Sequence, residues 1–112
     1  MGVPEPPVGA GPGWTLVGFL ECFDEWTARE SPSDDLRIIV ISWVMTRYDD
    51  PYQGVRRESD YPNLWFGVVP WSGHHGGSVV VCAYWIEAAT RTVRCDSFAT
   101  FRVPRGPDQP RT

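Results

Sequence analysis

The chain has 112 residues, the usual size of one domain, and its formal net charge is −4 with a pI near 5.0. This acidic balance argues against a broad phosphate-binding surface, because nucleic-acid binders usually display a net basic face. The apolar share of 42% includes six Trp, five Phe and four Tyr, which is enough for one packed core without disulfides or a metal.

The three cysteines, Cys22, Cys82 and Cys95, form no Cys-x-x-Cys pair and are odd in number, so a disulfide framework is not expected. The segment 1–13 holds acid and proline where a secretory signal needs basic residues and an apolar run. No later segment approaches eighteen uninterrupted apolar residues. We therefore expect a cytoplasmic protein without membrane contact.

Both ends of the chain are rich in proline and glycine and cannot bury enough apolar surface to pack. Residues 1–13 and 104–112 are predicted to be disordered arms around a single folded domain at 14–103. Within it, residues 14–20 are apolar and partly β-branched, which predicts a strand. Residues 21–30 place Phe23 and Trp26 three apart among acids, which predicts a short helix.

A second helix is predicted from 32 to 48. Ser31 suits the N-cap, Pro32 the first helical position, and Asp34 the third position of a capping box. Arg47 lies in the last turn, before Pro51. The apolar positions of this helix recur at i, i+3, i+4 and i+7 and predict its buried face: Leu36, Ile39, Val40 and Trp43.

Three strands are predicted in the second half, after a polar loop at 49–62. Residues 63–71 read as a strand, 72–77 as a hairpin turn, and 78–86 as a strand apolar on both faces and hence central in the sheet. After a turn at 87–90, residues 91–98 alternate Val93 and Cys95 inward with Arg94 and Asp96 outward, forming a second hairpin. Residues 99–103 either prolong this strand or bend away.

The resulting fold class is α+β, with an N-terminal strand, a two-helix hairpin and a three-stranded antiparallel sheet. This order resembles the RelE/ParE toxin superfamily of bacterial toxin-antitoxin modules. The segments that carry the resemblance are Asn63-Leu64-Trp65-Phe66, Val81 to Glu87 with its Tyr84-Trp85-Ile86, and Thr90 to Val93. It covers about residues 14 to 103.

The resemblance implies a small toxin neutralised by a cognate antitoxin. The activity it implies is that of a metal-independent, ribosome-dependent mRNA endonuclease, or action against DNA gyrase, with no cofactor. Carried onto this chain, the catalytic candidates are Arg57 in the loop before the sheet, Arg94 on the last strand and Arg102 beyond it. The binding candidates are Arg56, Tyr84 and His75. The acidic charge and the lack of a clear final helix depart from the family pattern.

Each candidate also has a simpler interpretation. Arg94 and Arg102 can share one face only if the strand between them stays regular, and otherwise pair with Asp96, Glu87 or solvent. His74 and His75 could exchange protons near neutral pH, but an ordinary polar hairpin tip is the simpler interpretation, because adjacent residues on a tight turn seldom converge. A zinc site could combine these histidines with Cys82 and Cys95. Both cysteines lie inside predicted strands and look like small buried hydrophobic residues, so no metal is expected.

The aromatic residues of the sheet could stack bases, although core packing explains them with fewer assumptions. Two functions thus remain open, a toxin-like nuclease and a catalytically inert domain of the same fold that binds a protein partner. A cluster of arginines on one sheet face favours the nuclease. Scattered or ion-paired arginines favour the binding domain.

Overall fold

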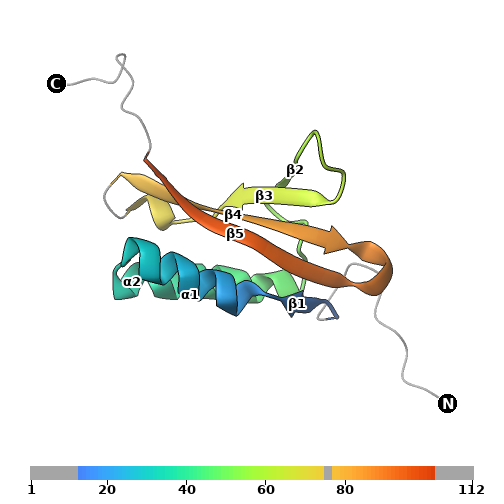
Figure 1. Cartoon of the computed structure of the whole chain (residues 1–112), viewed down its shortest axis with the longest axis horizontal. Helices are drawn as coiled ribbons and strands as arrows, with labels where there is room; N and C mark the ends of the chain where they lie inside the picture. The colour runs from blue at the N-terminus through green and yellow to red at the C-terminus, as the bar shows by residue number, and fades with distance from the viewer. Residues whose placement is uncertain (1–12, 75–76, 103–112) are drawn as a thin grey trace.

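The structure is a computed structural model that describes residues 13–74 and 77–102, and it confirms the α+β class (Figure 1). Five strands form one mixed sheet in the order β1-β5-β4-β3-β2. The strands are β1 (Thr15–Val17), β2 (Arg56–Arg57), β3 (Leu64–Val68), β4 (Ser78–Glu87) and β5 (Thr92–Arg102). The helices are α1 (Phe19–Glu30) and α2 (Asp34–Met45), with short 3-10 turns η1 (Thr46–Tyr48), η2 (Ser72–His74) and η3 (Ala88–Thr90).

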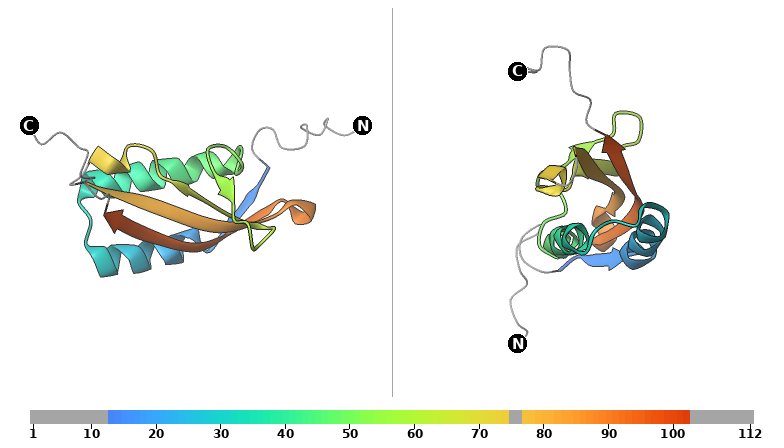
Figure 2. Two further views of the ribbon diagram at one scale, coloured as in Figure 1. Left: turned by 90° about the horizontal axis from the view of Figure 1, so that it is seen from above. Right: turned by 90° about the vertical axis from the view of Figure 1, so that its left-hand side faces the viewer.

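Both helices lie on one side of the sheet, as the end-on view in Figure 2 shows. We call this side of the sheet the inner face. Its β4 positions are fully or almost fully buried and form the core with the helices: Val80, Cys82, Tyr84 and Ile86. Because the opposite positions of β4 are also apolar, the second side of the sheet, the outer face, is not the polar surface usual for an antiparallel sheet.

The prediction of a three-stranded antiparallel sheet is wrong, since the sheet has five strands and one parallel pair. β1 runs parallel to β5, with Leu16 opposite Val93, and the long connection that a parallel pair requires contains both helices and the strands β2, β3 and β4. β2 pairs with β3 inside the segment predicted as loop. A two-residue strand is too short to show an alternating pattern, which is why the sequence did not reveal it.

The predicted first strand at 14–20 is shortened by Gly18, which has φ of 78° and ends β1 so that α1 begins at Phe19. The predicted capping box at Ser31 is also wrong. Ser31 instead ends α1 with φ of 48°, and Ser33 caps α2, its hydroxyl accepting from the Leu36 amide at 3.1 Å. Beyond this shift, α2 with η1 ends at Tyr48 as predicted.

The buried face predicted for the second helix is confirmed at Val40 and Trp43, while Leu36 and Ile39 pack partly against the same core. Both hairpins are confirmed, because β4 pairs antiparallel with β3 and with β5. β4 is the middle strand of the sheet, as its two apolar faces predicted. Residues 99–102 prolong β5 rather than bending away.

Helix α1 covers the part of the β5 edge that the short β1 leaves unpaired. The Arg29 guanidinium donates to the Phe98 carbonyl at 2.9 Å, and the Trp26 indole donates to the Thr100 hydroxyl at 2.8 Å. The first bond occupies a backbone carbonyl of the β5 edge that could otherwise pair with another strand, and the second joins the side chains of α1 and β5. α1 thereby holds the long strand that carries two of the candidate arginines.

The predicted disordered arms, 1–13 and 104–112, lie outside the described residues except for Gly13. Within the described part of the chain, neither helix has the length and apolar character needed to cross a membrane.

Candidate functional site

The three candidate catalytic arginines are placed on different parts of the sheet. Arg57 lies opposite Trp65, in register with the inner face, at the short edge strand β2. Arg94 lies opposite Trp85 on the outer face. Arg102 lies opposite Ser78, at the other end of β4. The structure therefore does not bring Arg57, Arg94 and Arg102 together, and all three side chains are exposed.

A β-bulge explains why Arg94 and Arg102 do not share a face. Cys95 lies opposite Tyr84 and Ser97 opposite Ala83, so Asp96 is an extra residue in β5. One extra residue reverses the side-chain alternation beyond it. Arg94 thus faces outward and Arg102 inward, about 26 Å apart along the strand at about 3.3 Å per residue.

Arg94 is ion-paired, with its guanidinium 2.6 Å from the Glu87 carboxylate. Pairing with Glu87 is one of the simpler interpretations that the sequence offered in place of a shared arginine site. Both side chains are partly exposed, 49% and 39%, so the pair contributes little to stability but does occupy the cation. Arg56, the first arginine of the adjacent pair, lies opposite Phe66 on the outer face, away from Arg57.

Tyr84, a predicted binding residue, has no exposed surface and so belongs to the core. Its hydroxyl donates to the Pro51 carbonyl at 2.5 Å and accepts from the Arg47 guanidinium at 3.0 Å. Burial raises the pKa of Tyr84 to about 12, against the opposing effect of nearby Arg47. This phenol is neutral and buried, and its hydroxyl already donates one hydrogen bond and accepts another. It therefore cannot contact a ligand at the surface.

Arg47 is itself only 2% exposed, a position that the helix-end prediction did not anticipate. It donates to the Gln53 carbonyl at 2.8 Å and to the Thr46 hydroxyl at 2.9 Å, and it lies 4.4 Å from the centre of the Trp43 ring. No carboxylate of the described residues forms an ion pair with it. Neutral acceptors and an aromatic face therefore hold this buried cation.

The cysteines and histidines give no metal or nucleophile site. Among the described residues no group of three metal-ligating side chains comes together. Cys82 and Cys95 are buried, as predicted. Burial raises the pKa of Cys22 to about 12, and the adjacent Cys82 thiol followed by burial raises that of Cys95, so both stay protonated. His75 and the side chain of His74 lie outside the described residues.

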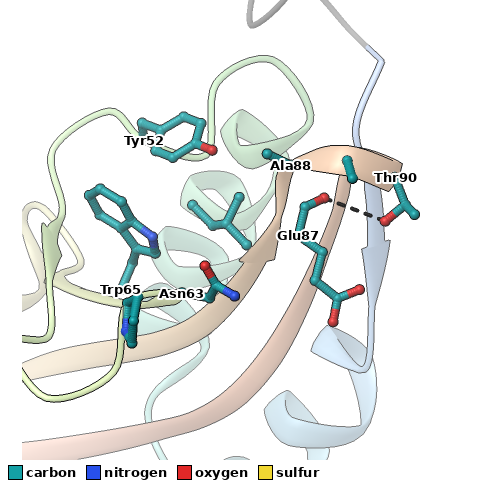
Figure 3. Close-up of a pocket in the computed structure, with 9 residues that line it drawn as sticks. Tyr52, Asn63, Trp65, Glu87, Ala88 and Thr90 are labelled. Atoms are coloured by element: carbon teal, nitrogen blue, oxygen red, sulfur yellow. Dashed lines mark hydrogen bonds between the residues drawn. The ribbon is translucent and has the colours of Figure 1, made fainter.

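A hollow of about 370 Å³ opens where β4 ends, between two aromatic rings and the η3 turn (Figure 3). Tyr52 and Trp65 meet edge to face with ring centres 5.1 Å apart. Asn63 and Thr90 contribute polar groups, while the Glu87 carboxylate turns away from the rings to Arg94 (Figure 3). This hollow offers apolar and neutral polar contacts but lacks a pair of groups for acid–base chemistry.

One group of exposed apolar side chains lies on the helical layer. Ile38 and Met45 of α2 are 63% and 55% exposed, and Leu20 of α1 is 65% exposed. Ile41 and Ser42 lie between Ile38 and Met45 along α2. We call this surface the α2 face and define it by Leu20, Ile38, Ile41, Ser42 and Met45.

Three hollows flank the α2 face. One of about 550 Å³ lies between α1 and α2 and includes Phe23, Ile38 and Ile41. Another of about 400 Å³ continues the groove past Ile41, Met45 and Leu20. The third, of about 490 Å³, separates Ile38 and Ser42 from Trp71. Ridges and grooves thus alternate on an apolar surface.

The sequence contains a signal for the α2 face that the prediction of a single buried helix face does not take into account. Residues 38–45 (IIVISWVM) include no charged side chain, and a helix that is apolar all round is normally covered on all sides. The prediction assigned one buried face and left Ile38, Ile41 and Met45 unexplained.

Comparison of the chain with protein-family models, with curated proteins and with solved structures finds no match. The resemblance to RelE/ParE toxins therefore stays a prediction.

The buried Tyr84 makes stability depend on pH in the alkaline range. Because its pKa rises from 10.0 to about 12 on folding, the unfolded chain loses this proton first as pH increases. The contribution of Tyr84 to stability is fully present below pH 10 and disappears as pH rises to about 12, a loss on the order of 2–3 kcal/mol.

Urea unfolding below pH 10 and near pH 12 measures this loss. Tyr84→Phe, which cannot ionise, should be less stable at neutral pH but should lose less stability on going to high pH. Equal alkaline losses in the wild type and in Tyr84→Phe would contradict the assignment of the buried phenol.

Proposed function

We propose that this domain is a protein-binding module that uses the α2 face to bind a partner. The observation that carries the proposal is the uncharged stretch Ile38–Met45, whose outward side chains Ile38 and Met45 are more than half exposed. Monomeric proteins rarely expose contiguous apolar patches of this kind without a partner. The proposal corresponds to the second of the two functions left open by the sequence.

The charge distribution indicates the chemistry of the partner. Residues 19–45 contain six carboxylates and two arginines, a formal charge of −4 that equals the net charge of the whole chain. The other residues carry eight acids and eight arginines and are neutral overall. Both helical arginines are ion-paired, Arg37 with Asp34 and Arg29 with Glu30. An apolar stripe beside unpaired acids favours a partner with apolar and basic residues.

An amphipathic helix satisfies both requirements. The grooves on either side of α2 can accept the ridges of a packed helix, and helix-in-groove recognition reads apolar residues at i, i+3, i+4 and i+7. Lysine or arginine along the edge of that helix would face the acids of α1, such as Glu21 at the rim of the groove. In a toxin-antitoxin module, such a helix would belong to the antitoxin.

The arrangement of the arginines supports the nuclease less well. Cleavage of RNA without a metal needs a base, an acid and a cation around one phosphate. Arg57, Arg94 and Arg102 lie apart, and Tyr84, which could have supplied a proton, is buried. Ion-paired and dispersed arginines are the pattern expected for a binding domain.

The binding proposal predicts affinity for a labelled synthetic helix of about 16 residues with a leucine stripe and lysines beside it. Fluorescence anisotropy should show saturable binding that weakens with salt, because part of the attraction is between charges. Ile38→Glu should weaken it at least about tenfold, since it places a charge in the apolar stripe at a residue that lines two of the grooves.

Val68→Glu is the matched control, because Val68 is a similarly exposed aliphatic residue, 49%, on the opposite side of the sheet. It should leave peptide affinity unchanged. A peptide with the lysines replaced by glutamate should bind weakly. Equal affinities for the basic and acidic peptides, or insensitivity to Ile38→Glu, would rule out the α2 face as the binding surface.

The nuclease alternative is tested by expression in a bacterial host together with an assay of mRNA cleavage. We expect the wild type and the triple variant Arg57→Ala, Arg94→Ala, Arg102→Ala to behave alike, because these side chains are far apart and exposed. Growth arrest and mRNA cleavage by the wild type alone, with both proteins folded, would restore the nuclease function.

A further inference from the structure

The outer face of the sheet is a second apolar surface. Strand register places nine apolar residues of β3, β4 and β5 on it: Leu64, Phe66, Val68, Val79, Val81, Ala83, Trp85, Ala99 and Phe101. Ser97 lies on the same side, and so does the ion pair of Arg94 with Glu87, at the end of the face where β4 ends. The side chains of Val68 and Phe101 are 49% and 53% exposed. No helix of the described residues covers this side, as the end-on view in Figure 2 shows. A solvent-facing antiparallel sheet would carry polar residues at these positions.

Charged residues stand at the two edges of the outer face, level with one another. Arg56 lies opposite Phe66, and Phe66 lies opposite Ala83. Ala83 in turn lies opposite Ser97, beside the bulged Asp96. Arg56, Phe66, Val68 and Val81 line one hollow of about 400 Å³, which places Arg56 on this side of the sheet.

The Asp96 carboxylate also belongs to the outer face, because it accepts from the indole of Trp85 at 3.3 Å. Neither Arg56 nor Asp96 forms an ion pair within the described residues. One edge of an apolar face therefore carries an available cation, and the other edge, in the same row, an available anion.

This arrangement is self-complementary. Consider a two-fold axis that runs parallel to β4 and lies above the outer face. A half-turn about it places the outer face of a second copy on the outer face of the first. The β3 side of each copy then lies over the β5 side of the other. The line of residues that runs across the strands from Arg56 to Asp96 then faces the same line of the second copy, running in the opposite direction. Arg56 of each copy lies over the edge that holds Asp96 of the other.

We propose that the outer face binds a second copy of this chain, giving a two-fold dimer with the sheets packed face to face. Sheets pack about 10 Å apart, with side chains of both faces filling the space between them. Val81 and Ala83 lie at the centre of the interface, and Val68 and Phe101 toward its sides. Two reciprocal contacts between Arg56 and Asp96 fix the register.

The size of the outer face fits this role. β4 and β5 have 10 and 11 residues and β3 has 5, so at about 3.3 Å per residue and about 4.8 Å between strands the face is roughly 400 Å² in flat projection. The two faces of a dimer together bury at least roughly 800 Å², which fits the small interface of a weak, reversible association. The dimer leaves the α2 face free, since α2 lies on the other side of the sheet (Figure 2).

Sedimentation velocity of the full chain from about 1 to 100 μM tests the dimer, a range that covers micromolar association. We expect a dimer that Phe101→Glu weakens at least about tenfold. Arg56→Asp and Asp96→Arg should each weaken it, and the two together should restore it, because the reversed charges again meet. A changed thermal melt of Asp96→Arg would indicate that this substitution alters the bulge. In that case Arg56→Asp and Phe101→Glu alone test whether the outer face forms the dimer.

Ile38→Glu is the control that separates this inference from the proposed function. It should leave the dimer unchanged while reducing binding of the basic helix. A monomer throughout the concentration range would overturn the dimer without affecting helix binding. A dimer that Ile38→Glu dissociates and Phe101→Glu does not would place self-association on the α2 face and would equally overturn the inference.

Discussion

The structure depends on the fact that its central strand is apolar on both faces. Val80, Cys82, Tyr84 and Ile86 point to the helices, and Val79, Val81, Ala83 and Trp85 point the other way. The described chain supplies one helical layer, which covers the inner face only. Since burial of apolar area is the main driving force of folding and association, the second face favours contact with another molecule. The α2 helix repeats the pattern, with apolar residues toward the core and away from it.

The buried guanidinium of Arg47 connects the helical layer to this strand. It links the end of α2, the Gln53 carbonyl of the following loop and the Tyr84 hydroxyl on β4. An isolated buried charge would be costly, but hydrogen bonds to neutral acceptors and the Trp43 ring compensate for lost hydration. This contact ties the end of the helical layer to β4. Val40 and Trp43 pack into the core, and Ile38 and Met45 on the other side of α2 stay exposed.

Helices and strands that are long enough to show a regular spacing of apolar residues could be predicted from the sequence. Helix α2, the antiparallel β4–β5 pair and the central place of β4 follow from the spacing of Val40 and Trp43 and from the run SVVVCAYWI. The pairing of β1 with β5 is a long-range contact that no local pattern contains. The bulge at Asp96 also escaped prediction, and it alone separates the faces of Arg94 and Arg102.

The candidate site was harder to predict than the fold, because exposure depends on packing. The sequence analysis placed Arg47 in the last helical turn and Tyr84 among the binding candidates, and packing buries both. The spacing placed Ile39 on the buried face and gave Ile38 no role, and in the structure Ile39 is half-buried while Ile38 is 63% exposed. The charge-free run 38–45 was visible from the start and is the one sequence feature that indicates the α2 face.

The proposed function requires that the α2 face, and neither the arginines nor the outer face, receives the partner helix. A ¹H–¹⁵N NMR titration of the labelled domain with the basic helical peptide tests it residue by residue. We expect the amide shifts of Leu20, Ile38, Ile41 and Met45 to change most, with little change at Arg57, Arg94 or Val81. Shifts concentrated on β2, β3 and β5, with those of α2 unchanged, would contradict the account.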